Sequence, residues 1–226
     1  MKKIFLAITI AVISLFFFAA CEKQGEEAGK HKGHEYVDLG LPSGLKWATC
    51  NVGAESPEEY GDYFAWGEVE PKTTYNWSTY KYGSDSHQLT KYCNNSDFGK
   101  DGFIDNKTVL DPEDDAATMN WGGAWRMPTY KETDELETKC TWDWTTQNGV
   151  NGYKVTGPNG NSIFLPAAGR MDEDAPNYVG SYGRYWSSSL SAVGPLGAND
   201  VYFGSGYVDR YGDYRFLGQS VRPVCQ

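Results

Sequence analysis

Alternating apolar and polar residues, broken by glycine- and asparagine-rich turns, mark the second half of the chain. Residues 141–147 (TWDWTTQ) and 152–157 (GYKVTG) flank Asn148-Gly149, and residues 161–167 (NSIFLPA) follow Pro158-Asn159-Gly160. Alternation is typical of a half-buried strand, and Asn-Gly favours the backbone of a tight hairpin turn. The pattern therefore predicts antiparallel hairpin strands in this region.

Three further strands are predicted near the C-terminus, at residues 184–190, 200–206 and 218–224. The glycine- and tyrosine-rich residues 207–217 between the last two strands are expected to form a loop. Apolar and polar positions also alternate at residues 45–52, which predicts an earlier strand.

Three segments in the first two-thirds of the chain carry the signature of a helix start. Ser56, Asp111 and Thr129 each precede an acidic residue three positions on, and a proline follows the first two. Acidic residues at such positions satisfy the free N–H groups of a helix start, so we interpret them as caps and not as catalytic carboxylates. Together the patterns predict the α+β fold class, with two or three short helices, a mainly antiparallel twisted sheet and long surface loops.

The N-terminus differs in character from the rest of the chain. Lys2 and Lys3 precede an apolar run that ends at Ala19-Ala20-Cys21. This layout predicts a signal peptide over residues 1–20, with an uncleaved membrane anchor as the alternative. Ala19-Ala20-Cys21 resembles the lipobox of bacterial lipoproteins, which implies lipidation of Cys21. Residues 21–34 are expected to form a flexible tether and residues 35–226 the domain. The acidic start of the tether resembles a surface-export tag, which predicts an outer membrane lipoprotein that faces the cell exterior.

Net charge limits the possible partners, and the number of cysteines limits the possible disulfides. The formal net charge is −10, which disfavours binding to nucleic acid because phosphate recognition needs a basic surface. Cys50, Cys93, Cys140 and Cys225 remain beyond Cys21, and an exported chain with this even number can form two disulfides. We favour Cys50 with Cys225, because both lie on apolar segments near the ends of the domain; four free thiols are the alternative.

No set of residues stands out as catalytic machinery. Ser187-Ser188-Ser189 lacks a nearby histidine base, and the acidic residues do not single out a glycosidase pair. Residues 97–108 resemble part of a calcium loop, but Gly99 and Thr108 replace two of its oxygen ligands. We therefore predict a protein that is not an enzyme and needs no cofactor, with calcium as the one ion left open and a carbohydrate-active enzyme as the less favoured alternative.

Tyrosine crowding near the C-terminus is the strongest functional signal. Tyrosine provides contact area at low entropic cost, and arginine, aspartate and glycine add adaptable hydrogen bonding, as in the binding loops of antibodies. The alternative is that half of these rings pack on a sheet. The candidate ligand-binding residues, taken from the loops between Asp172 and Tyr214 and from their flanks, are Tyr178, Tyr182, Tyr185, Trp186, Tyr202, Tyr207, Asp209, Arg210, Tyr211, Asp213, Tyr214 and Arg215.

Seven blocks in order give the chain a family resemblance over residues 35–226. It resembles the Fibrobacter succinogenes major paralogous domain, which is common in exported lipoproteins of Bacteroides-like bacteria. The blocks are Tyr36–Leu41, Lys46–Ala54, Gly61–Glu68, Trp121–Thr129, Phe164–Gly169, Tyr185–Ser189 and Ser220–Val224.

The resemblance implies a C-type-lectin-like fold related to that of formylglycine-generating enzymes, with its termini close together and a ligand-facing surface before a buried last strand. Some relatives are targets of diversity-generating retroelements, which enrich the residue types found between Tyr178 and Tyr214. The chain also departs from its wider relatives. Cys225 does not match their reactive cysteines, and Ala175-Pro176-Asn177 and Ala198-Asn199-Asp200 lack the glutamate and tryptophan of the lectin calcium motifs.

We therefore expect an adhesin-like or receptor-like lipoprotein that binds a protein or a glycan. A carbohydrate-binding module that uses calcium or aromatic stacking is the main alternative, and a structural lipoprotein without a specific ligand is a further one.

Overall fold

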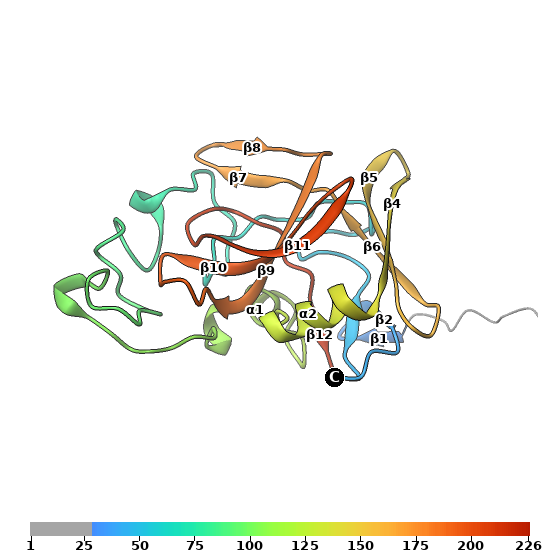
Figure 1. The fold of residues 1–226 in the computed structure, drawn as a ribbon, viewed down its shortest axis with the longest axis horizontal. Helices are drawn as coiled ribbons and strands as arrows, with labels where there is room; N and C mark the ends of the chain where they lie inside the picture. The colour runs from blue at the N-terminus through green and yellow to red at the C-terminus, as the bar shows by residue number, and fades with distance from the viewer. Residues whose placement is uncertain (1–28) are drawn as a thin grey trace, which may run out of the picture.

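The computed structural model describes residues 29–226, so the expected signal peptide and Cys21 lie outside the described residues. Its mainly antiparallel strands and two α-helices confirm the α+β class (Figure 1). The helical segments are η1 (Trp77–Thr79), η2 (Lys100–Gly102), η3 (Pro112–Asp114), α1 (Ala116–Trp121) and α2 (Tyr130–Lys139).

The strands form four antiparallel sheets. The first contains β1 (Gly29–His31), β2 (His34–Asp38), β3 (Lys46–Ala48) and β12 (Val224–Cys225); the second contains β4 (Thr141–Gln147), β5 (Val150–Thr156) and β6 (Ser162–Pro166). The third contains β9 (Tyr182–Leu190), β10 (Gly197–Gly204) and β11 (Tyr207–Tyr214), and the fourth is the pair β7 (Arg170–Asp172) and β8 (Ala175–Asn177).

The predicted hairpins are confirmed because their signals are local. β4 pairs with β5 across Asn148-Gly149, where both residues have positive φ, and β5 pairs with β6 after a turn that contains Gly160. Asn and Gly reach positive φ at the least energetic cost, so the sequence places these turns without help from the rest of the chain.

Helix α2 begins at the predicted cap. Thr129 accepts a hydrogen bond from the Glu132 N–H, and the Glu132 carboxylate accepts one from the Thr129 N–H. Arg126 holds the same carboxylate at 2.6 Å, which fixes the start of the helix. The helix then places Leu136 in the core.

Replacing Thr129 with alanine removes this cap, and we expect the free energy of unfolding to fall by about 1 kcal/mol. Urea denaturation followed by tryptophan fluorescence measures the loss. Thr138→Ala is the matched control, because the exposed Thr138 hydroxyl only bonds to the Asp134 carbonyl within the helix. Equal losses in the two variants would contradict a capping role for Thr129.

Two other expected helix starts turn out differently. Ser56–Glu59 forms a single turn, because Gly61 at φ 71° redirects the chain directly after it. At the second, Asp115 and not Asp111 caps α1, and Asp111 precedes the short helix η3.

Residues 29–34 belong to the folded sheet and not to the expected tether. β1 pairs with β2, and the His31 ring accepts a hydrogen bond from the Ala124 N–H at 3.0 Å. His34 stacks on Trp121 with 3.7 Å between ring centroids. β1, β2, β3 and β12 lie in this order in one sheet, which brings the start and the end of the described chain together (Figure 1).

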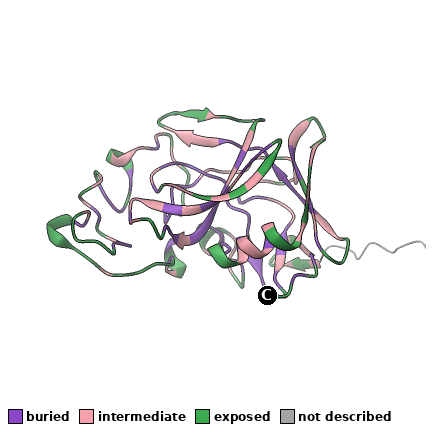
Figure 2. Cartoon of the chain, viewed as in Figure 1, coloured by how far each residue is buried: buried purple, intermediate pink, exposed green. Residues whose placement is uncertain are grey.

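The third sheet is the centre of the molecule, with apolar cores on both sides. Trp186 and Ala198 face a core that includes Trp66 and Tyr92, whereas Tyr185 and Phe203 face a second core that includes Leu136. Figure 2 shows this buried centre and the largely exposed loops around it. A strand between two cores must be apolar on both faces, which accounts for the YW sequence of β9.

The four described cysteines are free, so the structure does not contain the expected Cys50–Cys225 disulfide. Cys225 packs in a small core with Ala48 and Trp125, and Cys140 packs against the core around Leu136. Among residues 29–226, no helix has the length and apolar character needed to cross a bilayer.

Candidate functional site

The expected loop at residues 207–217 is largely a strand. Residues Tyr207–Tyr214 form β11, which pairs with β10 along its whole length and lies at the edge of the third sheet. Its residues alternate between more and less exposed positions, which is the period of a strand with one solvated face. The segment is polar because it is an edge strand, and not because it is irregular.

The twelve candidate binding residues divide by burial. Tyr178, Tyr207, Asp209, Tyr211 and Tyr214 are exposed, and Tyr182, Tyr202, Arg210 and Asp213 are half-buried. Tyr185, Trp186 and Arg215 are buried, at 4 %, 1 % and 0 % exposure, and therefore belong to the interior and not to a binding surface. The first two lie on the doubly covered β9, and Arg215 follows the last residue of β11 into the core.

Tyr182, Tyr202, Tyr207 and Tyr211 lie on one face of the third sheet, and Tyr178 from the loop after β8 packs against Tyr182. We call these five residues the tyrosine face. The Tyr182 ring lies 5.3 Å from Tyr178 and 5.6 Å from Tyr202 between centroids. The Tyr202 and Tyr207 rings are 5.3 Å apart, and their hydroxyls are hydrogen-bonded at 2.5 Å. Strand register puts Tyr211 opposite Asp200, on the same side as Tyr202.

Gly204 allows these rings to meet. It is the cross-strand partner of both Tyr182 and Tyr207, and a Cβ at this position would lie only 2.9 Å from the Tyr182 ring. A side chain there would push the two tyrosines apart.

A buried cluster of ion pairs packs against Tyr202 of the tyrosine face. The Arg184 guanidinium lies 4.1 Å from the Tyr202 ring centroid and pairs with both Asp200 and Asp213 at 2.9 Å. Arg170 pairs with Asp213 at 2.6 Å. The guanidinium under Tyr202 is therefore held in place by two carboxylates, which makes this part of the surface rigid.

Arg184 and Asp200 are absent from the twelve candidate binding residues predicted from the sequence. Arg184 lies two residues after Tyr182 on the same strand, so alternation alone puts the two side chains on one face. Their partners on β10 could be assigned only after the strand pairing was known.

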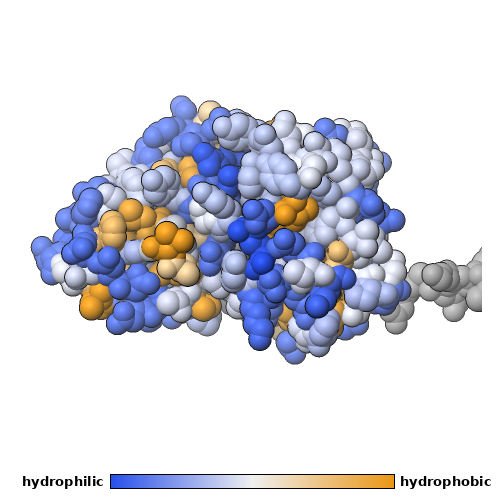
Figure 3. Space-filling model, viewed as in Figure 1, coloured by the Kyte–Doolittle hydropathy of each residue, from blue (hydrophilic) through white to orange (hydrophobic). Residues whose placement is uncertain are grey.

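A pocket of about 420 Å³ adjoins the tyrosine face at the far end of β11. Tyr211, Asp213 and Tyr214 form one wall, and the turn between β9 and β10 forms another with Val193 and Leu196. Figure 3 shows apolar side chains gathered at this end of the molecule. Val193 is fully exposed and Tyr211 is 62 % exposed, so apolar surface here is open to a ligand.

Arg215 ties two of the segments around this pocket together. Its guanidinium donates to the carbonyls of Pro195 in the β9–β10 turn and of Lys91 and Tyr92 in the loop that leads to Phe98, each at 2.9 Å. Phe98 also lines the pocket. Arg215 thus acts on the pocket as a positioning residue.

Arg210 lies on the opposite side of β11 from the tyrosine face. It pairs with Asp134 and Glu137 of α2 at 2.7 and 2.5 Å and lies over the Tyr130 ring. This candidate residue therefore attaches helix α2 to the sheet.

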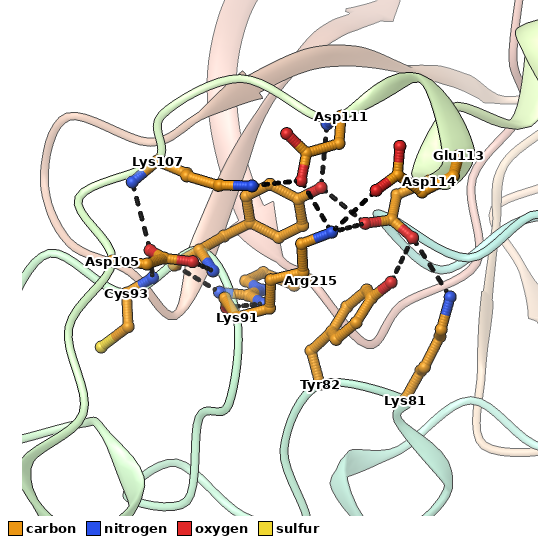
Figure 4. A network of polar contacts seen from close by, with 11 residues as sticks. Lys81, Tyr82, Lys91, Cys93, Asp105, Lys107, Asp111, Glu113, Asp114 and Arg215 are labelled. Atoms are coloured by element: carbon orange, nitrogen blue, oxygen red, sulfur yellow. Dashed lines mark hydrogen bonds and ion pairs between the residues drawn. The ribbon is translucent and has the colours of Figure 1, made fainter.

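A second polar network, centred on the buried Asp114, organises the long loop between β3 and α1 (Figure 4). Its carboxylate accepts hydrogen bonds from the Tyr82 and Tyr92 hydroxyls and pairs with two lysines, Lys81 and Lys91. Both of its oxygens are occupied by groups of the chain itself. The network holds the loop together and offers no free group to a substrate.

No cluster of three or more acidic, histidine or cysteine side chains suited to a metal occurs among residues 29–226. In the calcium-like segment, the Asp105 carboxylate accepts hydrogen bonds from the backbone N–H groups of Tyr92, Cys93 and Lys107. In the lectin-like segment, Asp200 is buried and ion-paired. The described residues thus give no support to calcium at either place.

Comparison with protein-family models, curated proteins and solved structures finds no match for this chain. The geometry of the tyrosine face and its pocket is therefore the basis for assigning a function.

Proposed function

We propose that the chain is an exported surface lipoprotein with a C-type-lectin-like domain that binds a protein or glycan ligand through the tyrosine face. The observation that carries the proposal is the contiguous set of four rings, Tyr178, Tyr182, Tyr202 and Tyr207, with neighbouring centroids 5.3–5.6 Å apart, on a sheet whose other face packs against a core. Rigid aromatic rings provide contact area with little loss of side-chain entropy on binding.

The pocket extends this surface. Its volume of about 420 Å³ lies within the usual range for small-molecule sites, and its lining is mainly apolar. A ligand that covers the tyrosine face can place an apolar group or one face of a sugar ring against Tyr211 and Leu196 there. The wall residue Asp213 is held by Arg170 and Arg184, so it shapes the pocket more than it attracts a cation.

Aromatic stacking on sugar rings is the second candidate mode, favoured by Tyr211 at the junction of the pocket and the face. Stacking requires exposed ring faces, and Tyr178, Tyr207 and Tyr211 are 57 %, 43 % and 62 % exposed. A protein ligand would use the same rings as interface anchors.

We expect binding to depend on Tyr207 and Tyr211. The test uses residues 22–226 on an array of neutral and acidic oligosaccharides and on a panel of immobilised collagen, fibronectin and laminin. Tyr207→Ala with Tyr211→Ala should weaken binding by about 10- to 100-fold, the effect expected for central aromatic anchors.

Tyr130→Ala is the matched control, because Tyr130 is also exposed but lies on α2 under Arg210. It should leave binding unchanged. Equal binding by both variants, or no binding of the wild-type chain to either panel, would contradict the proposal.

A further inference from the structure

The ion-pair cluster beneath the tyrosine face holds one carboxyl group in an unusual environment. Asp200 is 1 % exposed, and its Oδ2 accepts from Arg184 at 2.9 Å and from the Gln219 Nε2 at 3.0 Å. Its other oxygen, Oδ1, is buried without any hydrogen-bond partner among the described residues. An ionised carboxylate with a bare buried oxygen is strongly disfavoured.

Gln219 also carries a buried acceptor atom without a hydrogen-bond donor. It is fully buried, its Nε2 donates to Asp200, and its Oε1 is a buried acceptor without a donor in the described chain. The bonded pair of side chains thus contains two unsatisfied acceptors. A single proton on Asp200 Oδ1 would turn one of these two acceptors into a donor.

We propose that Asp200 is a neutral acid in the folded protein under mildly acidic conditions, and that it ionises near neutral pH and thereby changes the charge beneath the tyrosine face. Burial also raises the pKa of Asp200 to about 6, and the neighbouring Asp213 adds to this rise against the charge of Arg184.

The ion pairs around Asp200 connect charged groups of four strands. Arg170 and Asp172 come from β7, Arg184 from β9 and Asp213 from β11, while Gln219 is the uncharged partner. When Asp200 is neutral, the two arginines face Asp213 and Asp172 alone. When Asp200 ionises, the cluster gains one negative charge, and Arg184 then pairs with two ionised carboxylates, Asp200 and Asp213.

The consequence for binding follows from Arg184, which lies directly under Tyr202. Resting on the proposed function, we expect the tyrosine face to bind an anionic ligand more tightly below pH 6 than above it, because the guanidinium is then less neutralised. The proton uptake itself does not depend on any ligand.

The direct test is a ¹³C NMR titration of the aspartate carboxyl carbons in the chain of residues 22–226. One resonance should titrate near pH 6 and be absent in Asp200→Asn, while Asp143→Asn, which changes an exposed aspartate on β4, should leave it in place. If the Asp200 resonance titrates below pH 5, the proposal is overturned, whether or not a ligand is ever found.

Thermal unfolding gives a second, independent readout. A carboxyl whose pKa is higher in the folded state than its ordinary value of 3.8 stabilises the fold below pH 4, and that contribution is lost as pH rises through about 6. The asparagine amide of Asp200→Asn can donate where the acid proton did, so Tm between pH 4 and 6 should fall less in this variant than in wild type. A uniform destabilisation of Asp200→Asn at every pH would show an ordinary ion pair and overturn the proposal.

Discussion

Arg215→Met is expected to lower the free energy of unfolding by about 3–5 kcal/mol. The Arg215 side chain is fully buried and donates to the Tyr80 hydroxyl and to three backbone carbonyls, each at 2.9 Å. Methionine keeps much of the side-chain volume but supplies no donor, so the carbonyls would remain buried and unpaired. Chemical denaturation followed by circular dichroism measures the loss.

Arg210→Met, on the preceding strand β11, is the matched control. Arg210 pairs with two partly exposed acids of α2, and such pairs contribute at most about 1 kcal/mol. Arg215→Lys should fall between the two, because lysine keeps a charge but cannot donate to carbonyls on several sides at once. A loss in Arg215→Met no greater than that in Arg210→Met would show that Arg215 does not connect these segments.

The segments whose structure follows from local chemistry were predictable from the sequence. Asn148-Gly149 determines a hairpin, and Thr129 with Glu132 determines a helix start, whatever the rest of the chain does. The α+β class follows from these elements. By contrast, the Ser56 signature lacks a following apolar stripe and produces only one turn.

The burial of Trp186 and Arg215, which were predicted to bind a ligand, depends on contacts between distant parts of the chain. Trp186 is buried because Phe64 and Trp66 lie against it; its indole N–H donates to the Phe64 carbonyl at 2.8 Å. Arg215 resembles a surface arginine in the sequence, and only the folded loops around Tyr92 and Pro195 provide its acceptors. Composition reports which side chains can bind a ligand, but strand pairing decides which way they point.

The tyrosine face could be predicted from the sequence in part. Its tyrosine content was visible in the sequence, and alternation along β11 separates Tyr207 and Tyr211 from Arg210. The pocket could not be predicted, because Phe98, Val193 and Tyr211 come from three separate segments.

Asp114→Asn is expected to lower the free energy of unfolding by about 3 kcal/mol. The substitution preserves the shape of the side chain but replaces an acceptor oxygen with an N–H₂ group. Lys91 at 2.5 Å and the Tyr92 hydroxyl at 2.6 Å then lose a charged acceptor in a site where Asp114 is only 2 % exposed. Glu113→Gln is the control, since the Glu113 side chain is 67 % exposed and should change stability little.

The pH dependence separates Asp114 from Asp200, because the two pKa values are shifted in opposite directions. Burial alone would raise the pKa of Asp114, but hydrogen bonds from Lys91 and the two tyrosines outweigh it and lower the pKa to about 2. Its contribution is therefore complete above pH 4 and is lost as pH falls towards 2, a change of about 2 kcal/mol. Asp200 instead loses its contribution as pH rises through about 6.

Stability of the wild-type chain should therefore be greatest near pH 4 and decline on both sides of it. Asp114→Asn should flatten the acid side of that profile and leave the neutral side intact, and Asp200→Asn should do the reverse. Because the two carboxyls lie in separate networks with no shared partner, the double variant should combine the two losses additively. Coupling between them well above 0.5 kcal/mol would mean that the Asp114 loop and the tyrosine face form one unit.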